Sequence, residues 1–237
     1  LRTFCFDIKY FHRLLTQCVF IIIAPISHRF LQKTESVSPP VCFDIIGGAV
    51  TIKLLRHPTR ELYVDGELDS VTNGGFKYIS IHAKTDLHVV VNTEGVNVRQ
   101  GQSLTSHTGQ DHVTAGSVTV IRRDTEIDIS AEDVRMIIHI HEKDGKKLLW
   151  PVLTQRTSAN NTEGVLALNP AVYDEVHDQH STKLRIDGHE ISATNSTAVD
   201  YSIASPLEMR CWLVSADVIL PSPLIEFPHP LLQRGKF

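Results

Sequence analysis

From residue 41 onward, short β-favouring segments alternate with turn residues, and this pattern limits the fold more than any other feature. Segments such as VTIKLLR (50–56), FKYISIH (76–82) and VRMIIHIH (134–141) are rich in β-branched and aromatic residues, with Gly, Asn or Asp between them. In 126–129 and 134–141 apolar and polar residues alternate with a period near two, as in strands buried on one face. The pattern predicts an all-β fold, an antiparallel hairpin-rich sandwich or irregular barrel.

The turns and the one helical stretch can also be predicted. Three Asp-Gly pairs lie between β segments, at 65–66, 144–145 and 187–188. Because both residues tolerate positive φ, each pair predicts a tight hairpin turn. Only PAVYDEVHD (170–178) has a locally helical pattern, so we expect one short helix there.

The sequence predicts three regions. The stretch 14–26 is mainly apolar, follows basic residues and is too short to span a bilayer comfortably. It resembles a signal-peptide core; the alternatives are a poorly structured leader and a stretch that does not belong to the mature protein. QKTESVSPP (32–40) is polar, ends in two prolines and is typical of a linker. Near the other end, closely spaced prolines exclude a central strand. We therefore expect a leader and linker (1–40), a β-domain (41–216) and a Pro-rich tail (217–237).

The motif CFDI occurs twice, but only the copy at 42–45 leads into a turn and a second strand. The copy at 5–8 continues into KYFHRLLTQCVFIII without a turn, so we interpret the repetition as a coincidence.

The cysteines Cys5, Cys18, Cys42 and Cys211 form no CxxC motif and no cluster with histidine, which excludes the usual zinc-site patterns. Cys42 and Cys211 lie near the two ends of the β-patterned region, a placement that suits one long-range disulfide. The alternative is a pair of unlinked cysteines in the core.

Two acceptor tripeptides for N-glycosylation are present, at Asn160 and Asn195. Both fall in polar, loop-like stretches, TSANNTEG and SATNSTAVD, where a glycan needs to sit. Together with the expected disulfide, they predict an extracellular, secreted glycoprotein.

No motif for catalysis or for a cofactor is evident in the sequence. It contains no nucleophile elbow, no P-loop and no dinucleotide-binding glycine pattern. His139 and His141 would share one face of a strand, but no third ligand follows at a telling spacing, so we expect solvent-facing histidines rather than a metal site. The formal charge of −4 gives no general attraction to nucleic acid. We therefore expect a non-enzymatic protein with no cofactor, no metal and no nucleic-acid partner.

The start of the patterned region resembles a known family. CFDIIGGAVTIKLLRHPTRELYVDGEL (42–68) resembles the opening of the C-terminal domain of inter-alpha-trypsin inhibitor heavy chains. In that family a Cys-Phe-Asn/Asp-Ile strand leads through a Gly-containing turn to a Leu-rich strand and then to a hairpin. VDGE (64–67) takes the place of that hairpin here.

The far end of the region agrees with this resemblance. TKLRIDGHEISATNSTAVDYSIASPLEMRCWLV (182–214) is similar to the family's closing hairpin, its Asp-Tyr pair (Asp200 and Tyr201) and its Cys-Trp strand. EGVLALNPAVYDEV (163–176) is similar to the family's Gly-Leu-Leu-Gly turn, with Gly164 kept and Ala167 in place of the second glycine.

The resemblance implies an extracellular protein associated with hyaluronan-rich matrix and with the protease-inhibitor complex. The sequence has no Kunitz-type cysteine pattern, so it carries no inhibitory module of its own. It also has no Asp-Pro, so the family's ester link to chondroitin sulfate is not carried over. Its expected partners are a matrix glycosaminoglycan or other domains of a heavy-chain precursor. The alternative function is a membrane-tethered or orphan β-domain, anchored through 14–26, that acts as a protein-interaction module.

Overall fold

The computed structural model describes residues 2–10, 13–21, 26–35, 38–47, 50–69, 74–84, 86–155, 162–177 and 182–220. Strands dominate these residues and form three sheets, which confirms the all-β prediction. The first sheet is a hairpin of β1 (Arg2–Tyr10) and β2 (Arg13–Ile21), in which Cys5 lies opposite Cys18. The expectation that the first CFDI copy leads into no turn and no second strand is therefore wrong, because β1 contains it and pairs with β2.

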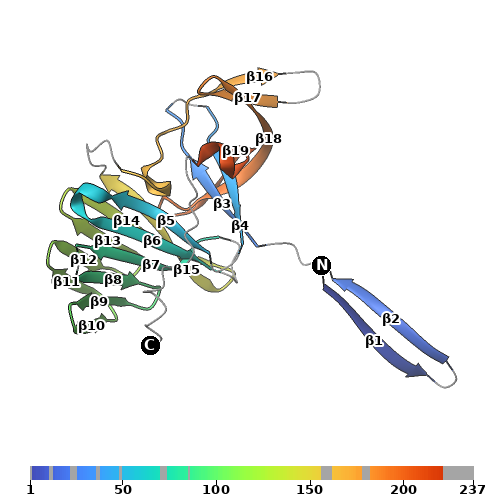
Figure 1. Ribbon diagram of the computed structural model, residues 1–237, viewed down its shortest axis with the longest axis horizontal. Helices are drawn as coiled ribbons and strands as arrows, with labels where there is room; N and C mark the ends of the chain where they lie inside the picture. The colour runs from blue at the N-terminus through green and yellow to red at the C-terminus, as the bar shows by residue number, and fades with distance from the viewer. Residues whose placement is uncertain are drawn as a thin grey trace.

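The largest sheet has eleven strands and curls into an incomplete barrel (Figure 1). One continuous path through it runs in the order β10-β9-β8-β7-β15-β14-β13-β12-β11, and β6 adds to β7 and carries β5. β7 pairs with β6, with β8 and, at one position, with β15. It therefore connects strands β5, β6 and β8–β10 to strands β11–β15. The strands are β5 (Thr51–His57), β6 (Leu62–Leu68), β7 (Phe76–Ala83), β8 (Leu87–Val91), β9 (Val96–Gln100), β10 (Ser103–His107), β11 (Asp111–Ala115), β12 (Val118–Arg122), β13 (Glu126–Ala131), β14 (Val134–Lys143) and β15 (Lys146–Gln155).

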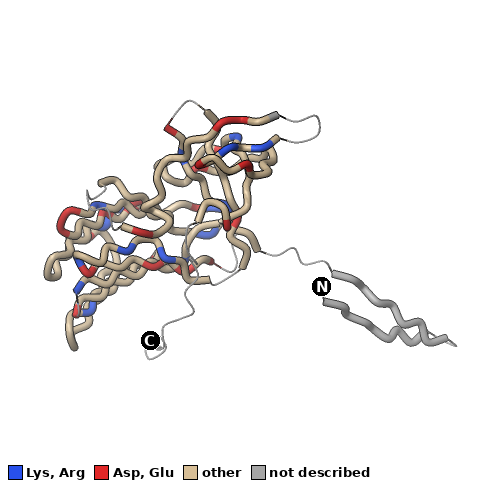
Figure 2. Tube along the Cα trace, turned by 45° about the horizontal axis from the view of Figure 1, so that its top comes forward, with Lys and Arg blue, Asp and Glu red and all other residues tan. Residues whose placement is uncertain are grey.

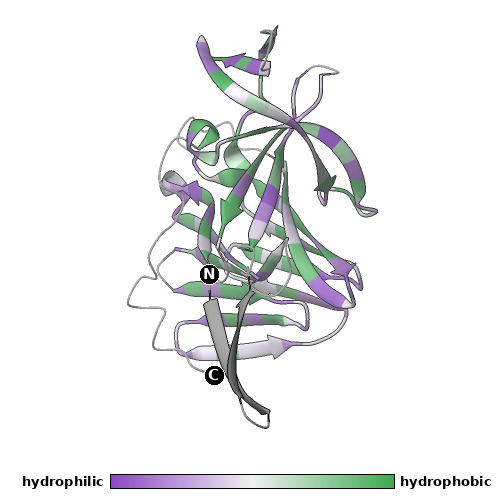
Figure 3. Ribbon diagram, turned by 90° about the vertical axis from the view of Figure 1, so that its right-hand side faces the viewer, coloured by the Kyte–Doolittle hydropathy of each residue, from purple (hydrophilic) through white to green (hydrophobic). Residues whose placement is uncertain are grey.

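Alternating side chains fill the interior of this barrel. In β8, Leu87, Val89 and Val91 are buried, whereas His88 and Val90 face outward and are only half-buried. Successive side chains of a strand point to opposite faces, so every second position reaches the core. Figure 3 shows the resulting alternation of hydrophobic and hydrophilic residues along the strands.

The third sheet is smaller and combines segments from both ends of the chain. Its order is β16-β17-β18-β19-β4-β3, and β19 with β4 is the one parallel pair within it. The strands are β3 (Ser27–Gln32), β4 (Val41–Ile46), β16 (Asp174–His177), β17 (Thr182–Ile186), β18 (His189–Asp200) and β19 (Leu207–Val214).

The packed domain begins earlier than the sequence indicates. The predicted boundary places residues 1–40 outside the domain, but β3 pairs along its whole length with β4. Phe30 of β3 is buried in the main core. A six-residue strand at a sheet edge gives too short an alternation to be recognised beside a polar linker, which explains the difference.

Two of the three predicted Asp-Gly turns are confirmed. The pair at 144–145 connects β14 to β15 and the pair at 187–188 connects β17 to β18, all four residues having positive φ between 48° and 80°. The prediction for Asp65 and Gly66 is wrong, since both lie inside β6. The absence of a side chain at Gly66 lets Phe76 and Leu54 pack against the strand: a Cβ there would lie 2.5 Å from Cδ1 of Phe76 and 2.8 Å from Cδ1 of Leu54.

Replacing Gly66 by alanine is expected to destabilise the domain by about 1–3 kcal/mol, because the added methyl group overlaps the buried ring of Phe76. Glu67→Ala, at a half-buried position in the same strand, is the control and is expected to change stability by less than about 0.5 kcal/mol. Urea denaturation of both variants measures the difference. Equal midpoints would contradict the close packing at Gly66.

The predicted helix at 170–178 is wrong. Residues 174–177 form the edge strand β16, which pairs with β17. The one short α-helix among the described residues is α1 (Ala216–Ile219), which directly follows β19. A helix this short is only marginally stable by itself, whereas pairing with β17 fixes these residues in a sheet, so sheet formation overrides the local pattern.

Candidate functional site

An aromatic cluster joins the smaller sheet to the barrel. The ring centroid of Phe30 from β3 lies 5.4 Å from that of Trp150 on β15 and 6.0 Å from that of Phe76 on β7. The centroid of the Tyr201 ring lies 5.2 Å from that of the same indole. Aromatic pairs at these distances attract one another in addition to the apolar area that they bury. The cluster therefore holds the two sheets together.

Beside this cluster lies a half-open pocket of about 250 Å³. Phe30, Phe43, Phe76 and Trp150 form its aromatic wall, and Leu54 contributes from β5. Gln32, Lys33, Asn169 and Ser202 also line it, so the pocket combines an apolar wall with a few polar groups. Such a combination is typical of small-molecule sites.

The segment that contains η2 (Val165–Ala167) also lines the pocket. Arg56 and Glu163 fix this segment to β5 through two backbone hydrogen bonds, of 2.8 and 3.0 Å. Gly164 follows with a φ of +116°, and a Cβ there would lie 2.5 Å from the carbonyl oxygen of Leu54. A glycine is therefore required for the wall to approach β5 so closely.

Two side-chain oxygen atoms of the lining residues lack a hydrogen-bond partner among the described residues, but both are buried and neither is exposed to the pocket. The side-chain Nε2 of Gln32 donates to the carbonyl of Asn169 at 2.7 Å. Its Oε1 and the Oγ of Ser202 are buried and have no hydrogen-bond partner among the described residues. At the rim, Nζ of Lys33 lies 3.7 Å from the carboxylate of Asp200.

His139 and His141 share one face of β14, as predicted, but they do not face solvent. Both are buried, and their ring centroids lie 5.6 Å apart. The Nε2–H of His141 donates to the backbone carbonyl of Tyr201 at 2.8 Å, since a carbonyl can only accept. The smaller sheet covers this face of the barrel, so the alternating pattern predicts the correct face and the wrong environment.

Four histidines have pKa values that burial lowers. Burial lowers the pKa of His28, although a hydrogen bond with the Gly47 backbone and the charge of Asp69 act in the opposite direction; Lys143 lowers it further. Burial also lowers the pKa of His141, although the hydrogen bond to the Tyr201 backbone acts in the opposite direction; His139 lowers it further. On the barrel surface, the rings of His82 and His88 stack 4.1 Å apart. Burial lowers both of their pKa values, that of His88 to about 4, with His82 and Arg99 contributing at His88.

The domain is therefore expected to lose stability as the pH falls below about 6.5 toward 4. In that window the unfolded chain binds protons that the folded histidines do not, so acid favours unfolding. Each such histidine adds a slope of at most about 1.4 kcal/mol per pH unit. Urea denaturation between pH 8 and 4 measures the slope. His141→Gln, which keeps a donor for Tyr201, should reduce it, whereas His189→Gln at an exposed position is the control.

The structure contains the predicted pairing of Cys42 with Cys211, across 169 positions of sequence, with their Cα atoms 5.8 Å apart. The bridge joins the neighbouring strands β4 and β19 and is buried together with Ala198.

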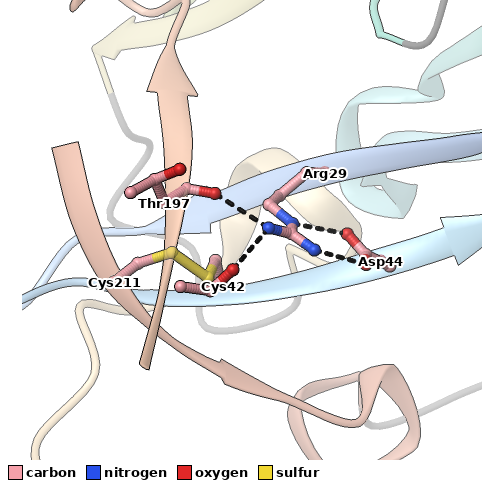
Figure 4. Close-up of polar contacts among 6 residues, drawn as sticks. Arg29, Cys42, Asp44, Thr197 and Cys211 are labelled. Carbon is pink, nitrogen blue, oxygen red and sulfur yellow. Dashed lines mark hydrogen bonds and ion pairs between the residues drawn. A yellow bond between two sulfur atoms is a disulfide. The ribbon is translucent and has the colours of Figure 1, made fainter. Parts of the chain in front are cut away.

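Beside the bridge, Arg29 of β3 binds both carboxylate oxygens of Asp44 at 2.8 Å (Figure 4). It also donates to Oγ of Ser196 at 2.7 Å and to the carbonyl of Thr197 at 2.8 Å. The disulfide and Arg29 together connect β3, β4, β18 and β19.

The two predicted glycosylation sites differ in their surroundings. Asn195 is exposed but lies within β18, opposite Trp212, and not in a loop as expected. Asn160 lies outside the described residues. Glycosylation at both positions stays a prediction.

Charged groups of both signs are dispersed over the described surface (Figure 2). Most of the described arginines contact a carboxylate, for example Arg123 with Glu126, Arg135 with Asp128 and Arg185 with Glu190. No group of three or more His, Cys, Asp or Glu is placed to hold a metal ion in the described part of the molecule. None of the described helices is long and apolar enough to cross a membrane.

Comparison with known proteins gives no relative: no protein-family model, no curated protein and no solved structure matches this protein. The pocket could not be predicted from the sequence, because its residues come from β3, β4, β5, β7, β15 and three connecting segments. Gly164 stands out in the sequence only through the resemblance, and its positive φ explains why a glycine is found there.

Proposed function

We propose that the protein is a secreted, non-enzymatic β-domain that acts in the extracellular matrix, as its resemblance to the C-terminal domain of the inhibitor heavy chains implies. The observation that carries this proposal is the buried Cys42–Cys211 disulfide, which ties the first strand of the predicted domain to its last. Disulfides of this kind persist in oxidising compartments. The exposed position of Asn195 is compatible with a glycan in the same compartment.

Between the two proposed partners, other domains of a heavy-chain precursor fit the surface better than hyaluronan does. A polyanion is best held by unpaired basic groups gathered on one face. Here Arg56 and Arg60 contact Asp65 and Glu132, as many of the other arginines contact carboxylates. We therefore propose a protein contact as the main interaction and a weak, salt-sensitive contact with glycosaminoglycan.

Expression of residues 1–237 behind a secretion signal in cultured cells tests the proposal. We expect soluble protein in the medium, and a loss of mass on treatment with an N-glycosidase that Asn195→Gln reduces. Any retention on immobilised hyaluronan at low salt should disappear before physiological salt is reached. Protein that stays with membranes after alkaline extraction would support the membrane-tethered alternative instead.

A further inference from the structure

We infer that the protein opens at the contact between the barrel and the smaller sheet when the medium becomes acidic, and that His28 and His141 sense the change. This contact, the seam, is formed around Phe30, Trp150 and Tyr201. The inference goes beyond the matrix role proposed above and does not depend on it. It rests on where the two buried imidazoles lie and on the groups that surround them.

His28 faces the barrel from the smaller sheet. It precedes Phe30 by two positions in β3, so both side chains point to the same side of the strand, and it is fully buried. Apart from a weak contact with the Gly47 backbone, neither ring nitrogen has a hydrogen-bond partner among the described residues. Of the nearby charges, Asp69 favours a proton on the ring and Lys143 opposes it. A protonated His28 would therefore be a buried charge with little compensation.

His141 faces the smaller sheet from the barrel. Its Nε2–H donates to the backbone carbonyl of Tyr201 at 2.8 Å, and this hydrogen bond crosses the seam. The ring centroid of His139, on the same face of β14, lies 5.6 Å from that of His141. A proton on His141 would therefore meet a second imidazole at close range.

The remaining charges near His141 offer little compensation for a proton. Lys143 is two positions further along β14 and is itself cationic. On β13, Glu126 lies opposite His139, but that carboxylate already binds Arg123 at 2.8 Å. Asp144, whose charge acts on Tyr201, lies in the exposed turn after β14.

Opening of the seam would bring both rings into water. Burial lowers the pKa of each ring in the closed form, whereas an exposed imidazole has a pKa near its ordinary value of about 6.5. Below that pH the open form binds protons that the closed form does not, so acid favours opening. Between pH 7.5 and 5, each ring can raise the opening constant by up to about 30-fold, and both together by up to about 1,000-fold.

Each sheet keeps bonds of its own when the seam opens. The disulfide between Cys42 and Cys211 and the contacts of Arg29 still connect the strands of the smaller sheet. The barrel strands keep their backbone pairing. The main loss falls on the aromatic contact between Phe30 and Trp150, so the indole of Trp150 reports the opening.

Hydrogen exchange of the Trp150 indole N–H, followed by NMR, tests the inference. The sequence contains two tryptophans, so residues 1–237 carrying Trp212→Phe give a single indole signal. Exchange is measured between pH 7.5 and 5, where exposed carboxylates remain largely ionised, and is corrected for its intrinsic pH dependence. We expect weaker protection of the indole than of the amides in β13, because it exchanges without global unfolding. Its protection should fall by up to about 1,000-fold over this range.

Variants identify the sensing groups. His28→Leu and His141→Gln should each limit the fall to about 30-fold, because one of the two rings no longer binds a proton. His88→Gln is the control: burial also lowers the pKa of His88, but it lies on β8 beside His82, so indole protection should not change. If His28→Leu does not fold, His141→Gln carries the same test.

Three results would overturn the inference. Equal protection of the indole and of the β13 amides at pH 5 would mean that the seam opens only by global unfolding. A fall of less than about threefold in the Trp212→Phe protein would mean that acid does not act on the seam. An unchanged fall in His28→Leu and His141→Gln would mean that other groups sense the acid.

Discussion

Replacing Cys42 and Cys211 together by alanine is expected to lower the free energy of unfolding by about 4–5 kcal/mol. The bridge closes a loop of 169 positions, so removing it restores a large amount of freedom to the unfolded polypeptide. Alanine is the suitable replacement because both positions are buried, and a serine hydroxyl there would add a cost of its own.

Guanidinium denaturation of the double variant and of the natural protein measures this effect. The natural protein in excess reductant is a second route to the same state, and its stability should fall by a similar amount. A loss smaller than about 1 kcal/mol by both routes would mean that packing around Ala198 and Arg29, and not the bridge, holds the smaller sheet together.

Trp150→Ala is expected to cost about 3–5 kcal/mol, because it removes the ring that contacts Phe30, Phe76 and Tyr201 at once. The loss should affect the contact between the barrel and the smaller sheet in particular. Amide hydrogen exchange is therefore expected to rise most in β3 and β15, where Phe30 and Trp150 lie.

Trp212→Ala is the matched control for this experiment. Trp212 is half-buried in the smaller sheet and lies outside the aromatic cluster, so its replacement should cost less and should leave exchange in β15 unchanged. Equal losses in the two variants would contradict the assignment of Trp150 to the contact between the sheets.

The fold class and the positions of many strands follow from local pattern. The alternation in β13 and β14 and the Asp-Gly turns at 144–145 and 187–188 each depend on a few neighbouring residues. At Gly66 the local pattern gives the wrong prediction, since the residue lies in a strand and not in a turn. Its turn propensity is overridden by the ring of Phe76, which needs the space that a Cβ would fill.

The candidate site depends on contacts that no short stretch of sequence records. Alternation places His139 and His141 on one face, but only the position of the smaller sheet decides that this face is buried. The pocket likewise requires β3 and β15, which are more than 100 positions apart, to pack against each other. The pairing of Cys42 with Cys211 can be predicted because it depends on residue type and on position at the domain ends.

We propose that this protein is a secreted domain held closed by the long-range disulfide between Cys42 and Cys211. Peptide mapping without reductant, on protein recovered from the medium of expressing cells, tests it most directly. We predict a linked pair of peptides containing Cys42 and Cys211, which separates on reduction. Finding both thiols free in otherwise folded, secreted protein would contradict the claim.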